Sequence, residues 1–244
     1  MQTIMRKAVA ITGTMVMLFG LSGCLGASIR VPADQAFALS ASALSGSDNY
    51  AFTGEMAVIN PGGKVGSRAS YEGEVSDHGN LKVQWKNLST TSESTARTNR
   101  IDYRPLQILE TINGQTATIS YSEKPIASQP VSLQIQLDEK TAKERISSGL
   151  KKEMALVRAD SVLVGRHPER SEEILTAADK RLERMLSTLK ATTVVHWKAN
   201  PKNWFPYQMK EETVLSYEWQ GKPYQEKRTA ETNFLVRNQG GTIK

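Results

Sequence analysis

The sequence has few of the residues from which catalytic and metal sites are usually built. It contains one cysteine and three histidines among 244 residues, so neither a disulfide framework nor a cysteine-rich metal site is available. It also lacks the HExxH and GxSxG motifs and any glycine-rich phosphate loop. These absences predict a protein that is not an enzyme and that uses no metal and no cofactor.

The other ionisable residues show no arrangement that catalysis would need. His78 falls in an expected turn, His167 between two expected helices and His196 in an expected strand. Glu211 and Glu212 are neighbours in the sequence, and adjacent carboxylates do not flank a substrate as a general acid and base must. We interpret these two carboxylates as solvated charges.

Basic and acidic residues are nearly balanced and are interspersed along the chain. The 31 Lys and Arg against 25 Asp and Glu give a net charge of +6, without the basic stripe that nucleic-acid binding requires. No stretch after the N-terminal region approaches the roughly 20 apolar residues of a membrane span. We expect no nucleic-acid partner and no second membrane segment.

Residues 1–24 have the pattern of a bacterial export signal. Arg6 and Lys7 precede an apolar run from Ala8 to Leu21, which is too short for a spanning helix. The run leads into Leu21-Ser22-Gly23-Cys24, which resembles the bacterial lipobox: an aliphatic residue, two small residues and a cysteine.

The lipobox resemblance implies that residues 1–23 are a signal peptide and that Cys24 becomes a diacylglyceryl cysteine. Two acyl chains hold a protein on a bilayer far better than one. The expected location is therefore the extracytoplasmic face of the cell membrane. Residues 24–32 would form a lipidated tether, 33–238 a single domain and 239–244 a flexible tail.

The spacing of apolar residues predicts two blocks of strands. Residues 34–44 have helical spacing, and strict alternation of apolar and polar residues follows in short segments separated by turn residues. The segment 87–100 is rich in Ser and Thr, and it could be either an edge strand or a loop. The expected strands begin near Tyr50, Val65, Leu81, Ala117, Val131, Thr193, Tyr207 and Tyr224.

Two consecutive helices are expected between the strand blocks. The first extends from Asp138, a candidate N-cap, to about Leu163, and the second from Pro168 to Lys190, with Ile174 on its inner face. Segregated blocks of strands and helices are typical of α+β folds. We expect a large antiparallel sheet with an N-terminal helix and a central helical pair covering one face.

Large apolar side chains share the even-spaced faces of the expected strands. They are either the core under the helices or, in part, the lining of an open cavity, since ligand pockets are mostly apolar. The candidate cavity-lining residues are Phe52, Met56, Tyr71, Trp85, Trp197, Met209, Leu215 and Tyr217.

The layout resembles the lipoprotein-carrier superfamily that includes LolA, LolB and the mycobacterial LppX and LprG proteins. The segments that carry the resemblance are an N-terminal helix before Tyr50–Glu55, the hairpin partner Ser70–Glu74, and the terminal pair 206–219 and 222–236. The resemblance implies a curved half-barrel sheet that is covered by helices and encloses an apolar cavity for acyl chains. The segment 87–100 and the helical pair depart from the family pattern.

Two functions from different classes follow from these observations. The first is a membrane-anchored, non-enzymatic lipoprotein that binds a lipid or other apolar ligand in the half-barrel. The alternative is a surface-interaction or sensor lipoprotein of the cell envelope, for example a sporulation component, with a solid core and a protein partner. In the alternative, the segment 87–100 would serve as the docking edge.

Overall fold

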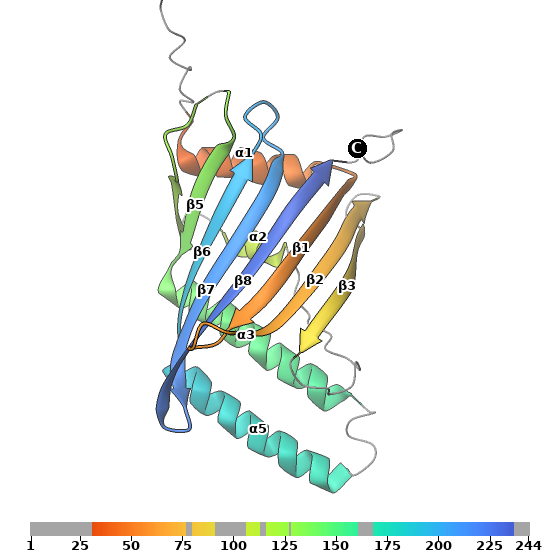
Figure 1. Cartoon of the computed structure of the whole chain (residues 1–244), viewed down its shortest axis with the longest axis vertical. Helices are drawn as coiled ribbons and strands as arrows, with labels where there is room; N and C mark the ends of the chain where they lie inside the picture. The colour runs from red at the N-terminus through yellow and green to blue at the C-terminus, as the bar shows by residue number, and fades with distance from the viewer. Residues whose placement is uncertain are drawn as a thin grey trace, which may run out of the picture.

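The sheet unites both strand blocks of the chain. The computed structural model describes residues 31–76, 80–90, 106–112, 116–126, 128–160 and 168–236. Within these ranges it shows one eight-stranded antiparallel sheet in the order β3-β2-β1-β8-β7-β6-β5-β4 (Figure 1). The strands are β1 (Tyr50–Ile59), β2 (Val65–Ser76), β3 (Asn80–Thr90), β4 (Ala117–Tyr121), β5 (Val131–Leu137), β6 (Lys190–Ala199), β7 (Pro206–Trp219) and β8 (Lys222–Val236). Because the last strand pairs with the first, the blocks on either side of the helices form a single open sheet.

Four helices accompany this sheet in the described part of the chain. They are α1 (Ala33–Ser45), α2 (Gln107–Thr111), α3 (Glu139–Ala159) and α5 (Pro168–Thr188). Helices α1, α2 and α3 lie on one side of the sheet, and α5 extends below it beside the β7–β8 hairpin (Figure 1). The predicted α+β fold, with its curved antiparallel sheet, N-terminal helix and central helical pair, is confirmed. In the ranges described, no helix combines the length and the apolar character that crossing a membrane requires.

The sequence predicted the start of α3 correctly, but not its end or the inner face of α5. Asp138 is the N-cap of α3, as predicted, and its carboxylate accepts a hydrogen bond of 2.9 Å from the Thr141 amide. Helix α3 ends at Ala159, earlier than expected; Leu163 lies outside the described residues. Ile174, expected on the inner face of α5, is 59% exposed. It is exposed because the side chains of α5 that pack on the core come from its last turns.

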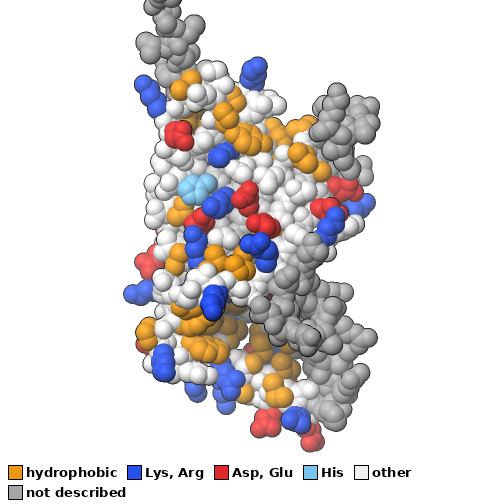
Figure 2. Space-filling view, viewed as in Figure 1, with side chains coloured by type: hydrophobic (Ala, Val, Ile, Leu, Met, Phe, Trp, Pro, Cys, Tyr) orange, Lys and Arg blue, Asp and Glu red, His pale blue; other side chains and the backbone are white. Residues whose placement is uncertain are grey.

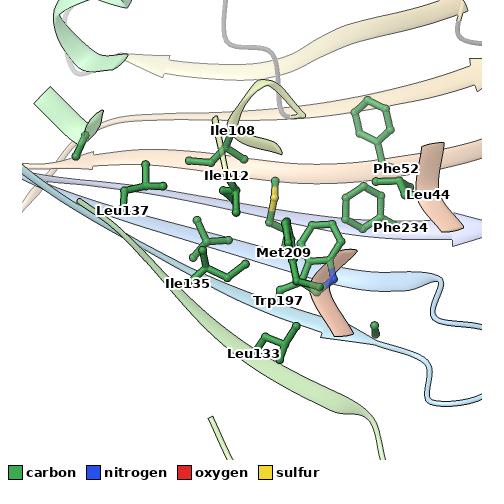
Figure 3. Packing of buried hydrophobic residues seen from close by; sticks show 14 of the residues in the cluster. Leu44, Phe52, Ile108, Ile112, Leu133, Ile135, Leu137, Trp197, Met209 and Phe234 are labelled. Atoms are coloured by element: carbon green, nitrogen blue, oxygen red, sulfur yellow. The ribbon is translucent and has the colours of Figure 1, made fainter. Parts of the chain in front are cut away.

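The inner face of the sheet is a packed core at the end where α1 lies, the upper end in Figure 1. Trp197 is fully buried there, with its ring 5.6 Å from that of Phe37 in an edge-to-face arrangement. Its indole N–H donates a 2.8 Å hydrogen bond to the equally buried Ser40 hydroxyl of α1. Figure 3 shows Trp197, Met209 and Phe234 directed into this interior. Here α1 and the sheet interlock, and the side chains between them are buried.

Two glycines admit aromatic rings to this face. A Cβ built on Gly54 would lie 2.3 Å from the Glu231 carbonyl oxygen and 2.5 Å from the Tyr71 ring. A Cβ on Gly73 would lie 2.3 Å from the ring of Phe52. All three distances are shorter than real Cβ contacts, so each ring occupies the volume that a side chain would fill.

The outer face of the sheet is covered by paired charges. Glu212 lies between Lys210 at 2.8 Å and Lys227 at 2.6 Å, and side chains of both signs intermingle on this face (Figure 2). The hydrogen bonds from Lys210 and Lys227 lower the pKa of Glu212 to about 2. This face is therefore a solvated surface, whereas the opposite face holds the core and the cavity described next.

Candidate functional site

A cavity of about 450 Å³ lies between α3 and the inner face of the sheet. Strands β1, β7 and β8 form its floor, α3 forms one wall, and Gln107 and Thr111 of α2 border it towards the packed core. Volumes of about 300–1,000 Å³ are typical of small-molecule sites. The space is therefore sufficient for one small ligand.

The strand register brings apolar and ionisable side chains together on the floor. Ala230 of β8 pairs with Met56 of β1 on one side and with Glu211 of β7 on the other. In the next row, Thr213 pairs with Arg228. Because all five side chains belong to the same face of the pleated sheet, a ligand here would meet both apolar and charged groups.

The wall is formed by one side of α3. Arg145 and Gly149 are four residues apart, so they lie one above the other on the helix, beside Ile146 and Leu150. A Cβ built on Gly149 would meet no atom within 4 Å beyond its adjacent residues and the backbone of α3. The absence of a side chain at Gly149 keeps this part of the wall open.

A buried polar network joins the wall to the floor. Arg145 donates a hydrogen bond from Nη2 to Glu211 Oε1, and the Thr213 hydroxyl donates to the same oxygen at 3.2 Å. Thr213 also shares a 2.9 Å hydrogen bond with Thr193 of β6. The Glu211 side chain is only 8% exposed and that of Arg145 19%, so this ion pair is shielded from solvent.

A second polar group lies nearer the β7–β8 hairpin. Arg228 donates to Glu226 Oε1 from Nε at 2.8 Å, and the Tyr217 hydroxyl lies 3.3 Å from Glu226 Oε2. Burial, together with the charge of Glu226, raises the pKa of Tyr217. Tyr217 therefore stays protonated and donates to the carboxylate.

The eight candidate cavity-lining residues occupy three different environments. Met56 lines the cavity. Trp85 and Tyr217 are partly buried and pack against the core. The other five are buried members of the core cluster, and none of them lies on the wall of this cavity: Phe52, Tyr71, Trp197, Met209 and Leu215.

The solvated-charge interpretation of Glu211 is wrong, whereas that of Glu212 fits its position. Consecutive strand residues point to opposite faces, so Glu212 is on the outer surface and Glu211 is inside, 6% exposed. A sequence signal existed: Met209, Glu211, Thr213 and Leu215 form one alternating stripe, with an acid at a position that should be apolar. An acid in a buried stripe needs a partner, and Arg145 of α3 supplies it.

No metal-binding group is formed by the described residues: they contain no cluster of three or more His, Cys, Asp or Glu side chains that could hold an ion. His196 is half-buried on β6 and pairs in register with Gln134 and Lys210. The other two histidines, His78 and His167, lie outside the described ranges.

These features define an α+β domain in which an open antiparallel sheet and a crossing helix enclose a small amphipathic cavity. No family model and no curated protein match the sequence. A structural match exists to a LolA superfamily protein from Nitrosomonas europaea, with a TM-score of 0.26 and 7% sequence identity. The match covers 85% of this chain and 94% of that protein.

Proposed function

We propose that this chain is a lipid-anchored protein of the bacterial cell envelope that binds a lipid or other apolar ligand without catalysing a reaction. The observation that carries the proposal is the 450 Å³ cavity between α3 and the sheet. Met56, Ala230, Ile146 and Leu150 supply apolar surface for a hydrocarbon chain. Binding a ligand needs only such a lining, whereas catalysis would also need a reactive group.

The proposed anchor is Cys24 at the end of Leu21-Ser22-Gly23-Cys24. Cells that express the full chain and are fed an alkyne-bearing palmitate analogue should yield labelled protein in the membrane fraction. The Cys24→Ser variant should remain unlabelled. Equal labelling of both proteins would show that the acyl group is elsewhere.

Ligand occupancy can be tested on the chain from Ala27 onward, which keeps every residue of the described fold. We expect native mass spectrometry of protein purified without detergent to show a bound lipid at one per chain. Extraction and analysis of that lipid would identify its class. An apo mass that persists after addition of phospholipid and acylglycerol would contradict the proposal.

The cavity can be filled from Gly149. The Gly149→Trp variant should lose the bound ligand, because the indole would enter the open space beside this wall, where a Cβ meets no atom within 4 Å beyond its adjacent residues and the backbone of α3. Gly149→Ala is the matched control: it should retain the ligand and gain about 0.5–1 kcal/mol of stability from its better helix propensity. Ligand retention by Gly149→Trp would place the binding site elsewhere. Leu215 is unsuitable for this test because it is 1% exposed in the packed core.

The packed core under α1 favours a second candidate, a lipoprotein whose surface binds an envelope protein. In that case the apolar sheet face serves stability alone. The proposed docking edge is the segment 87–100, which starts within β3; the backbone of β3 extends to Thr90, and residues 91–100 lie outside the described ranges. Deleting residues 91–100 should then abolish capture of a partner from crosslinked envelopes and leave lipid content unchanged.

A further inference from the structure

The end of the sheet beside α1 exposes an apolar rim, formed by Leu81, Leu235 and Val236. In the last row of the sheet, Val236 of β8 pairs with Tyr50, Tyr50 with Val75, and Val75 with Leu81 of β3. The two central side chains are buried, whereas Val236 is 52% exposed, Leu81 41% and the neighbouring Leu235 49%. In Figure 2, hydrophobic side chains gather at this upper end of the sheet, whereas charged ones occupy its middle. The core therefore continues to the surface at this end.

The exposed side of α1, next to the rim, is almost free of charge. Leu39 is 38% exposed, and it shares this side of the helix with Gln35, Ala38 and Ser42. Asp34 is the single charged residue among the 13 of α1, whereas α3 and α5 have nine each among 21. A helix that faces water normally carries charged residues on its exposed side. Helix α1 departs from that pattern, and α3 and α5 follow it.

The proposed anchor decides which end of the molecule can stand on the bilayer. The Tyr121 hydroxyl donates a 2.6 Å hydrogen bond to the Val31 carbonyl, so the chain is fixed to the domain at the start of α1. Seven residues along the chain lead from Cys24 to Val31, a reach of at most about 25 Å. Strands β7 and β8 have 14 and 15 residues, which extend about 45–50 Å. If the β7–β8 hairpin and α5 stood on the bilayer, Val31 would be too far above it for the tether.

Lying flat on the outer face of the sheet is the other way for the domain to meet the bilayer. Glu212 lies there between Lys210 and Lys227, and charged side chains of both signs cover this region (Figure 2). Charged groups are costly to place in hydrocarbon. The surface that is both close to Cys24 and nearly uncharged is therefore the α1 end.

We propose that the exposed side of α1 and the apolar rim rest in the surface of the bilayer that holds the Cys24 lipid. The partner is a lipid surface, and the domain stands on it with α5 and the β7–β8 hairpin directed away. This inference rests on the proposed anchor and is independent of the proposed ligand in the cavity. Because α1 carries one charge, the contact is apolar, and vesicles of phosphatidylcholine alone should support it.

Fluorescent labels on single cysteines show which end touches the membrane. In the lipidated full chain the thiol of Cys24 is bonded to the lipid, so an introduced cysteine is the only free thiol. Ser42→Cys places an NBD label on the exposed side of α1. Ile174→Cys is the matched control, because it lies on the exposed side of a helix at the far end, where Leu156 and Val157 are also exposed. Each labelled protein is reconstituted in phosphatidylcholine vesicles that contain a nitroxide lipid as quencher.

We expect the label at Ser42→Cys to brighten at least about twofold on vesicles without quencher, relative to the same label on the soluble chain from Ala27 onward, because it leaves water. The nitroxide lipid should then quench it. The label at Ile174→Cys should neither brighten nor be quenched.

A second pair of variants tests the apolar contact itself. Leu39→Glu, added to Ser42→Cys, should reduce the quenching by at least about half, because a carboxylate at this position must stay hydrated. Leu156→Glu, added to Ser42→Cys, makes the same chemical change at an exposed leucine of the far end. It should leave the quenching unchanged.

The outcomes separate this orientation from the anchor. If the vesicle-bound protein shows no quenching at Ser42→Cys, or equal or stronger quenching at Ile174→Cys, the orientation is wrong while the anchor stands. Brightening at Ser42→Cys without quenching would mean that protein covers α1, which also overturns the proposal. If the full chain takes up no palmitate analogue and does not associate with vesicles, the anchor and the orientation both fail.

Discussion

Substituting Gly54 by alanine tests whether the core is as tightly packed as the geometry indicates. The new methyl group would lie 2.3 Å from the Glu231 carbonyl oxygen and 2.5 Å from Cζ and Oη of Tyr71. The carbonyl belongs to the neighbouring strand β8, so it cannot rotate away. The Tyr71 ring would have to move, although it is 2% exposed and closely packed.

The expected cost has two parts. Overpacking of a core costs about 1–3 kcal/mol. Displacing Tyr71 also breaks the 2.7 Å hydrogen bond between its hydroxyl and Thr232, which is 0% exposed, and leaves a buried hydroxyl unpaired at a cost of about 1–3 kcal/mol. Replacing a glycine within a strand by alanine also stabilises the fold by about 0.5–1 kcal/mol, because the unfolded chain loses conformational freedom. We therefore expect Gly54→Ala to lower the free energy of unfolding by about 3 kcal/mol.

Urea unfolding followed by tryptophan fluorescence measures this difference by linear extrapolation. Gly66→Ala is the matched control, because its Cβ would lie 3.7 Å from the nearest atom, the Val58 carbonyl oxygen. It should change the free energy of unfolding by less than about 1 kcal/mol. If Gly54→Ala were as stable as Gly66→Ala, the inferred contact between Tyr71 and the Gly54 backbone would be wrong.

Three further predictions concern the remaining polar contacts. Ser40→Ala removes the acceptor of the Trp197 N–H and should destabilise the fold by about 1–3 kcal/mol in urea unfolding; an unchanged midpoint would contradict the buried hydrogen bond. Asp138→Ala removes the cap of α3 and should cost about 1 kcal/mol in the same assay, whereas Asp138→Asn should cost less. The pKa of Glu212 falls from 4.5 in the unfolded chain to about 2, so its contribution is complete above pH 4.5 and is lost as the pH falls towards 2. Because Glu212 and its partners Lys210 and Lys227 are partly solvated, that contribution is below about 1 kcal/mol. Measured as unfolding free energy against pH, Glu212→Gln should flatten the profile only in this pH range, most clearly at low salt.

The sequence predicted the fold because its local patterns agree with each other. The alternation in β5 and β6 fixes which side chains point inward, and the register follows once two such strands pair. The change to helical spacing after Asp138 marks α3 without ambiguity. Helix α2 was missed because five residues are too few for a period to be seen, and its buried residue Ile108 is held by contacts with the rest of the core.

The candidate site was predicted less well, because period-two spacing identifies a face but not what covers it. Trp197 and Met56 share the inner face of the sheet, yet one is sealed by α1 and the other borders the space beneath α3. The positions of the helices along the strands depend on tertiary packing, and alternation contains no information about them.

An irregularity within the alternation is the more useful sign of a site. Between Met209 and Leu215 the inner stripe of β7 carries Glu211 and Thr213 in place of two apolar residues. In a core that serves stability alone, such positions should be apolar, because a buried carboxylate requires a partner and loses its hydration. The chain supplies Arg145 on α3 and leaves Gly149 without a side chain one turn away, so the charged pair, the open wall and the cavity coincide. Interruptions of a buried stripe by ionisable residues therefore locate the candidate site better than the large aromatic residues do, since the aromatic residues fill the space that a ligand would need.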